Sequence, residues 1–175
     1  MAAPNLSQDD MLARTARFNQ LTPSTQAFVD TRLPEHKRDI FNVIGRGVTE
    51  DTSLAPAISA AQDFNLTYVG AEPGKGAALH SHSTVEVFIA MSGRWAVYWG
   101  EDGANEIELG KWDVVSVPPG VMRGFRNVGD APAHLMAILG GTDAGKVDWA
   151  KSVSERAAAS GLARDAEGNL IETSA

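Results

Sequence analysis

The segment "ALHSHSTVEV", from Ala78 to Val87, holds two of the four histidines of the chain and a glutamate four residues after the second. On a strand, His80 and His82 project from the same face, and Glu86 shares their parity. Two imidazoles and a carboxylate suit Fe(II), Mn(II), Ni(II) or Zn(II), and with open positions they form the oxygen-activating iron arrangement. Two surface histidines that happen to lie near a carboxylate are the alternative, and spacing alone leaves both open.

Length, charge and cysteine content exclude several classes of binding partner and of metal site. At 175 residues, the chain is long enough for one domain with additional elements at its ends. A net charge of -7 argues against nucleic acid, which requires a basic surface. The sequence contains no cysteine, so any metal must be held by nitrogen and oxygen. Without a signal-like N-terminus or an apolar run long enough for a membrane span, we expect a cytoplasmic protein that binds no membrane.

The central part of the chain has an all-β texture. Short β-prone runs alternate there with turns rich in glycine and proline, which predicts an antiparallel sandwich or barrel. Eight such runs lie between Phe64 and Gly140: "FNLTYVGA", "AALHSH", "EVFIAM", "GRWAVYWG", "NEIELG", "DVVSVPPG", "GFRNVG" and "AHLMAILGG". On the fourth run, Trp95 shares a face with Trp99, and we expect core packing there in preference to substrate stacking.

Helical patterns flank this region. We expect an amphipathic helix from Ser7 to about Gln20 and a short second helix over 23–31. A closing helix over 149–160, with Asp148 as N-cap and Gly161 after its end, is followed by a hairpin-like or frayed tail. The predicted organisation is an N-terminal helical arm (1–39), a β-barrel (40–141) and a C-terminal helix and tail (142–175).

The histidine cluster and its glycines resemble the first conserved motif of the cupin superfamily. Gly74, His80, His82, Glu86 and Gly93 stand at the spacings of that motif. Downstream, "GKWDVVSVPPGVMRGFRN" resembles the second cupin motif, including Asp113, Pro118, Gly120 and Asn127. The resemblance covers roughly 64–140. It implies a small antiparallel jelly-roll barrel with a central pocket and helical extensions at both ends.

The resemblance also implies a ligand set, from which this chain departs. Metal-binding cupins use the two histidines and the glutamate of the first motif and a histidine of the second; here those positions are His80, His82, Glu86 and Arg123. Arginine has no lone pair to offer a metal. Lesser departures are Trp112, where the second motif usually has glycine, and Met122.

Three arrangements of Arg123 are open. In the first, the three remaining ligands hold the metal, and Arg123 binds an acidic substrate at the open side as a catalytic residue. In the second, Arg123 pairs with Glu86, which leaves a metal-free binding pocket or a metal-independent isomerase or epimerase with a histidine as base. In the third, Arg123 points outward and side chains fill the pocket.

We favour the first arrangement. It predicts a small enzyme that uses a divalent metal (Fe, Mn, Ni or Zn), with oxygenase chemistry ahead of isomerase or lyase chemistry, on a small anionic organic substrate. A non-catalytic metabolite-binding protein is the rival, so enzymatic activity is open at this point. We expect a homodimer, because a partner can cover the exposed edges of an open barrel. The resemblance to cupins also implies a dimer.

Overall fold

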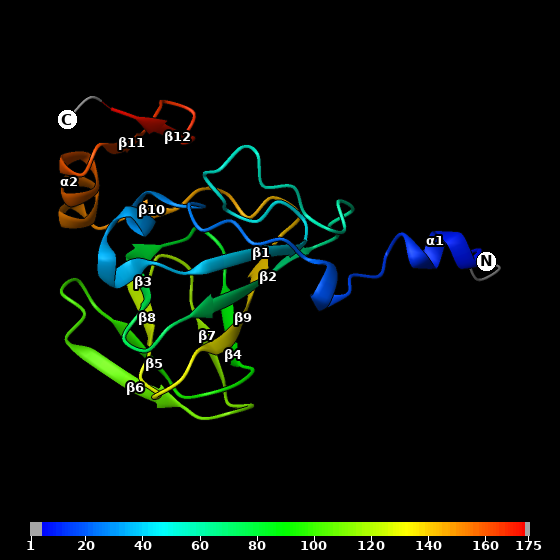
Figure 1. Cartoon of the computed structure of the whole chain (residues 1–175), viewed down its shortest axis with the longest axis horizontal. Helices are drawn as coiled ribbons and strands as arrows, with labels where there is room; N and C mark the ends of the chain where they lie inside the picture. Colours follow the sequence, from blue (N-terminus) through cyan, green and yellow to red (C-terminus); the bar gives the residue numbers. More distant parts are fainter. Residues whose placement is uncertain (1–4, 174–175) are drawn as a thin grey trace.

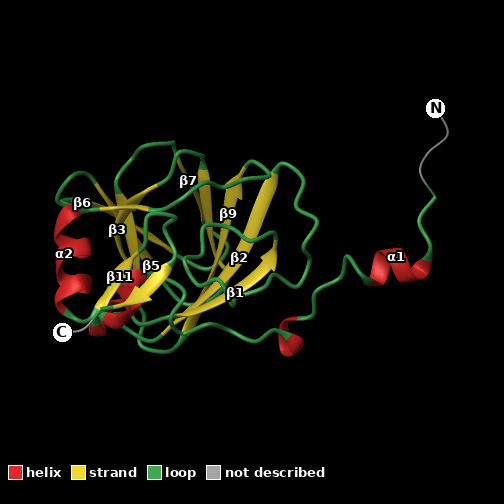
Figure 2. Cartoon of the chain, turned by 90° about the horizontal axis from the view of Figure 1, so that it is seen from above, coloured by secondary structure: helices red, strands yellow, loops and turns green. Residues whose placement is uncertain are grey.

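The computed structural model describes residues 5–173, and its main body is an antiparallel β-barrel (Figure 1). Two five-stranded sheets form it, in the orders β1-β2-β9-β4-β7 and β10-β3-β8-β5-β6. The strands of the first are β1 (Asp39–Ile44), β2 (Phe64–Ala71), β9 (Ala133–Gly140), β4 (Glu86–Ala90) and β7 (Val114–Val117). The strands of the second are β10 (Asp148–Trp149), β3 (Gly76–Ser81), β8 (Arg123–Asn127), β5 (Trp95–Trp99) and β6 (Asn105–Leu109). Viewed from above, the sheets enclose a common interior (Figure 2), which confirms the predicted all-β jelly roll.

Each of the eight β-prone runs forms one strand, from β2 to β9. Alternate side chains of these strands meet in the core, as the period of a strand requires. Phe125 contacts Phe88 and Trp95, with ring centroids 5.2 and 5.9 Å apart. Trp95 is fully buried, and its indole nitrogen donates a hydrogen bond to the carbonyl oxygen of Ser92. The core role predicted for Trp95 is therefore confirmed.

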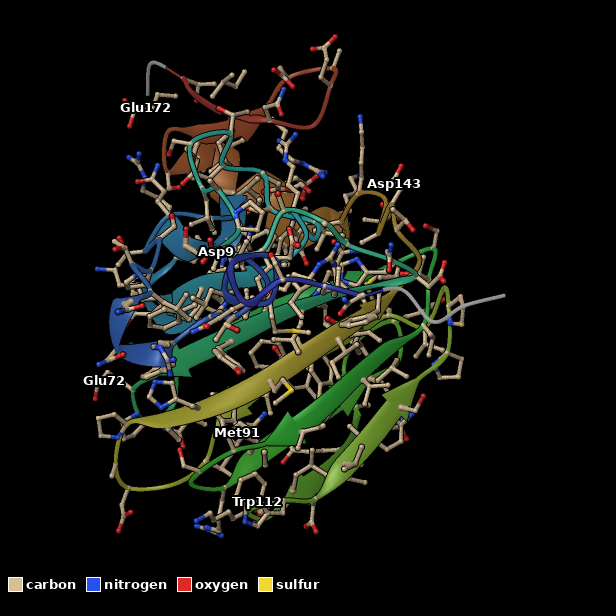
Figure 3. All side chains as sticks on the ribbon, turned by 90° about the vertical axis from the view of Figure 1, so that its right-hand side faces the viewer. Asp9, Glu72, Met91, Trp112, Asp143 and Glu172 are labelled. Atoms are coloured by element: carbon tan, nitrogen blue, oxygen red, sulfur yellow. The ribbon has the colours of Figure 1, made fainter. Side chains whose placement is uncertain are left out.

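Two turn positions of the motifs have a backbone conformation that favours glycine. Gly93 has a φ of 67°, and a Cβ placed on it would lie 2.6 Å from the Cβ of Ala133. Trp112, at the position where the motif usually has glycine, has a φ of 73°. This left-handed conformation is unfavourable for a bulky L-residue. Trp112 is 61% exposed and lies at the end of the barrel opposite the C-terminal elements (Figure 3).

The predicted N-terminal helices are mostly wrong. Helix α1 (Gln8–Leu12) begins after a capping box at Ser7, as the sequence suggested, but it ends before Ala13, and only a short 3₁₀ turn follows at Phe18–Gln20. The helix predicted over 23–31 is absent, since Ser24 exchanges two backbone hydrogen bonds of 2.9 Å with Ile40 and so extends the sheet. Packing against the barrel overrides local propensity there. Further 3₁₀ turns follow at Val29–Arg32 and Pro34–His36.

The C-terminal prediction is nearly correct. Helix α2 (Lys151–Ala159) begins two residues later than expected, because Asp148 belongs to β10 and the N-cap is Ala150. Gly161 has a φ of 84°, as its place after the helix requires. The tail forms a hairpin of β11 (Leu162–Arg164) and β12 (Leu170–Glu172). Within residues 5–173, none of the helices has the length and apolarity needed to cross a membrane.

The two flanking segments meet at one end of the barrel. In Figure 1, the blue segment before β1 and the orange β10 and α2 lie side by side. The rings of Phe28 and Trp149 pack edge to face there, with centroids 6.1 Å apart. Residues from both ends of the chain therefore cover the same mouth of the barrel. Helix α1, by contrast, stands away from the barrel and buries none of its residues.

Candidate metal centre

The structure brings the three predicted ligands together. His80 in β3, His82 just after that strand, and Glu86 at the start of β4 each offer one ligand atom, and these atoms lie within 4.8 Å of one another. All three residues are buried. The sheet pattern explains this arrangement, because residues two apart on a strand share a face and the turn after β3 returns the chain to the barrel interior. Metal binding by this group stays a prediction.

Hydrogen bonding prepares His80 for coordination. Its Nδ1 lies 2.7 Å from the carbonyl oxygen of Ala78. Because a carbonyl oxygen only accepts, Nδ1 carries the proton, and the lone pair is on Nε2. Metal-binding histidines commonly have this arrangement of the second ring nitrogen.

Both histidines are neutral near pH 7. Burial, with smaller contributions from His82 and Arg123, holds the pKa of His80 well below its usual value. Burial and the charge of Arg123 lower the pKa of His82 to about 3. Neutral imidazole is the form that binds a metal, so protons do not compete with the metal for these nitrogens at neutral pH.

Arg123 forms a buried ion pair with Glu86. Its Nε and Nη2 both donate to Oε2 of Glu86, at 3.0 and 2.6 Å, and Nη1 donates to the carbonyl oxygens of Val121 and His80. The same Oε2 lies 3.6 Å from Nε2 of His82. Burial raises the pKa of Glu86, and Arg123 opposes the rise by its charge and hydrogen bonds. A metal that took Oε1 of Glu86 would leave both of these Arg123 hydrogen bonds in place.

This geometry excludes one of the three arrangements that the sequence left open and combines features of the other two. The outward arrangement is wrong, because Arg123 is completely buried. The ion pair is the contact expected in the second arrangement, and the grouped ligand atoms are those expected in the first. Both features are present together, because the two hydrogen bonds of Arg123 to Glu86 end on a single carboxylate oxygen. The catalytic role of Arg123 stays a prediction.

The triad lines a small cavity with mostly apolar walls. Its free space is about 40 Å³, room for about three water-sized groups. Phe28, Val48 and Trp149 contribute walls from outside the sequence motifs. The indole of Trp149 lies against His80, with ring centroids 5.2 Å apart, and β10 pairs these two residues across the sheet. Sequence reasoning missed these walls, because no spacing connects them to the histidines.

Glu50 fixes the cover of this cavity. Its Oε1 accepts a hydrogen bond of 2.8 Å from the indole nitrogen of Trp149, and its Oε2 accepts one of 2.7 Å from the backbone of Val29. Arg164 of the C-terminal hairpin lies 3.2 Å from Oε1. Burial raises the pKa of Glu50 to about 7, against the opposing effect of these donors. One buried carboxyl thus joins three segments that are distant in sequence.

The other two histidines lie apart from the triad. His134 packs edge to face on Phe18, with ring centroids 5.2 Å apart, and lines a groove on the outer surface. His36 belongs to a 3₁₀ turn, where burial lowers its pKa. Neither residue lines the barrel cavity.

Comparison with known proteins shows which family and which solved structures this barrel resembles. A family model described as "Cupin domain" matches residues 67–139. A search of curated proteins gave no match. Among solved structures, the chain is similar to the polyketide cyclase RemF from Streptomyces resistomycificus, with 14% identity, a TM-score of 0.57, and 77% of this chain and 82% of that chain covered.

Two further solved structures have the same fold. A cupin 2 domain-containing protein from Halorhodospira halophila is 20% identical, with a TM-score of 0.53 over 70% of this chain and 77% of that one. An oxalate oxidase is 16% identical, with a TM-score of 0.54 over 77% of this chain and 62% of that one. These likenesses concern the fold alone. Together with the two sequence motifs, the family match identifies residues 67–139, most of the barrel, as a cupin domain.

Proposed function

We propose that this protein is a metal-dependent cupin enzyme that acts on a small organic anion inside the barrel. The observation that carries the proposal is the meeting of one ligand atom each from His80, His82 and Glu86 within 4.8 Å, in a buried cavity. The fixed tautomer of His80 supports it, because that hydrogen bond leaves Nε2 unprotonated.

Each residue of the site has a defined part in this proposal. The two imidazoles and Oε1 of Glu86 hold a divalent ion, with Fe, Mn, Ni and Zn as candidates. Three protein ligands leave coordination positions at which the metal supplies Lewis-acid or oxygen chemistry. Arg123 positions Glu86 by holding Oε2, and the apolar walls exclude bulk water. We place oxygenase chemistry first and isomerase or lyase chemistry second.

The charge balance of the cavity favours an anionic substrate. Arg123 offsets Glu86, and both histidines are neutral near pH 7. A divalent ion bound to this set therefore adds two positive charges that no further carboxylate of the triad neutralises. Uncompensated charge in an apolar cavity is unfavourable, and an anion bound beside the metal removes part of it.

A second function is a metal-independent binding protein or isomerase. The Arg123–Glu86 ion pair favours it, since the pair already satisfies the carboxylate. Against catalysis without metal stands the pKa of about 3 at His82, which makes this imidazole a weak general base at neutral pH.

Metal analysis distinguishes the two functions. We expect near-stoichiometric metal in protein purified without chelator, measured by inductively coupled plasma mass spectrometry, and its loss in His80→Ala. His134→Ala is the matched control, because His134 lies outside the cavity, and it should retain the metal. Equal metal content in both variants, or metal-free wild-type protein after loading with each candidate ion, would refute the metalloenzyme.

A further inference from the structure

A buried arginine other than Arg123 lines the barrel cavity. Arg38, just before β1, has a side chain that is 2% exposed. Its Nη1 donates to Oδ2 of Asp30 at 2.9 Å and to the carbonyl oxygens of His36 and Gly76 at 2.8 and 3.3 Å. Within residues 5–173, its Nε is buried without a hydrogen-bond partner. A buried donor without a partner is unfavourable, so such a group beside a cavity points to a ligand.

The place of Arg38 is suited to a ligand that also reaches the metal. Arg38 lines the same small cavity as His80, His82 and Glu86. It also lines the larger groove on the outer surface, with Lys37. Its side chain is therefore part of the wall between that groove and the barrel interior. Phe28, another wall of the cavity, packs on the guanidinium, with Cζ 5.2 Å from the ring centroid.

The two buried arginines differ in what they have left to donate. Arg123 directs Nε and Nη2 together at Glu86. Arg38 gives its partner Asp30 a single hydrogen bond through Nη1, and both Nε of Arg38 and Oδ1 of Asp30 are buried without partners. The Nε edge of a guanidinium matches a carboxylate in shape and charge.

We infer that Arg38, and not Arg123, is the residue that binds the anionic group of the ligand in this barrel. The ligand class is a small carboxylate: one oxygen accepts the hydrogen bond of Arg38 Nε, and the remainder of the molecule faces the triad. A cavity of about 40 Å³ restricts it to a few heavy atoms unless the cover of the cavity moves. The inference rests on the proposed function for the role of the metal, but anion binding at Arg38 does not require the metal.

Two variants with opposite expected effects test the inference. Arg38→Lys keeps a cation beside Asp30 but removes the Nε edge, so we expect acetate and oxalate to bind at least tenfold more weakly. Asp30→Asn removes the charge that offsets Arg38, so the same anions should bind more tightly. Arg32→Lys, the same change at an arginine of the outer groove, is the matched control and should leave binding unchanged.

The measurement is isothermal titration of full-length protein with sodium acetate and sodium oxalate at constant ionic strength. It is made once on chelator-treated protein and once after loading with Mn(II). If the protein fails to load metal but anion binding still depends on Arg38, the proposed function is contradicted and the inference about Arg38 is not. Equal anion affinity in wild type, Arg38→Lys and Asp30→Asn overturns the inference, as does an absence of anion binding by wild type in both states. Should Arg38→Lys fail to fold, the increase expected in Asp30→Asn decides.

Discussion

Arg123 on β8 and Glu86 on β4 join the two sheets of the barrel through its interior, with two hydrogen bonds of 3.0 and 2.6 Å to one carboxylate oxygen. Removal of one partner from a buried ion pair typically destabilises a protein by about 3–5 kcal/mol, because the other charge is left uncompensated. The same pair holds the carboxylate that would serve as third metal ligand. Arg123 therefore connects the stability of the barrel to the affinity of the site.

Arg123→His should convert the site to four ligands and release Oε2 of Glu86. We expect metal affinity to increase by at least tenfold, measured by competition with a chelating dye, and activity on an acidic substrate to fall. Arg123→Leu is the control, because it also releases Glu86 but adds no ligand. Equal metal affinities for Arg123→His and Arg123→Leu would show that an imidazole at 123 does not reach the metal.

Glu50 should make stability depend on pH in the direction opposite to that of an ordinary carboxyl. Its pKa is about 7 in the folded protein, compared with 4.5 for an unperturbed glutamate. Between these values the folded state binds more protons, so the contribution of Glu50 to stability falls as pH rises from about 4.5 through 7. The maximum effect is on the order of 3 kcal/mol.

The histidines act in the opposite sense, which makes a difference measurement necessary. Since burial lowers the pKa values of His80 and His82, their contribution to stability is lost as pH falls below about 6.5. Urea unfolding of wild type and Glu50→Gln at a series of pH values cancels this shared effect. The wild type should lose stability relative to Glu50→Gln as pH rises from 5 to 8. A pH-independent difference between the two would contradict a raised pKa at Glu50.

Trp149 should be the residue that closes the cavity. Trp149→Phe keeps an aromatic ring near His80 but removes the hydrogen bond to Glu50, and we expect a loss of about 1–3 kcal/mol in unfolding free energy. Trp149→Ala should lose about 3–5 kcal/mol and admit larger anions, such as benzoate, that wild type rejects. Rejection of benzoate by a folded Trp149→Ala variant would mean that the cover lies elsewhere.

Trp112→Gly should stabilise the protein by about 1 kcal/mol, because glycine adopts a positive φ without strain. The larger loss of backbone entropy on folding offsets part of this gain. Trp112→Ala keeps the strained conformation, so it separates the backbone effect from loss of the indole. Thermal unfolding of both variants provides the measurement. If alanine stabilises as much as glycine, backbone strain at this position is not the cause.

The homodimer stays a prediction, and the N-terminal arm offers a test. Leu6, Met11 and Leu12 are 47, 54 and 51% exposed, around a helix that buries nothing in its own chain. Apolar residues of this kind are covered when a partner binds them. Sedimentation velocity should detect a dimer for the full chain and a larger monomer fraction after deletion of residues 1–17. A monomeric full chain at micromolar concentration would refute the dimer.

The sequence predicted the barrel and the grouping of its ligands because both depend on local periodicity. His80 and His82 share a face by parity, and the strands from β2 to β9 follow the hydrophobic alternation. The sequence analysis favoured a substrate as the partner of Arg123 and did not single out Glu86. The contact with Glu86 depends on how the two sheets pack, which spacing along one strand does not encode. The segment before β1 was misread for a related reason: Ser24 pairs with Ile40, a contact visible only after folding.

The family match covers residues 67–139, whereas Phe28, Arg38, Glu50 and Trp149 lie outside it. A fragment trimmed to the matched boundaries would retain the histidines but lack the cover of the cavity, the buried carboxyl that anchors it and Arg38, the arginine that lines it. The residues that enclose the cavity therefore extend beyond the segment that the family model matches. Grafts and chimaeras that exchange only the barrel would transfer a coordination motif without its selectivity.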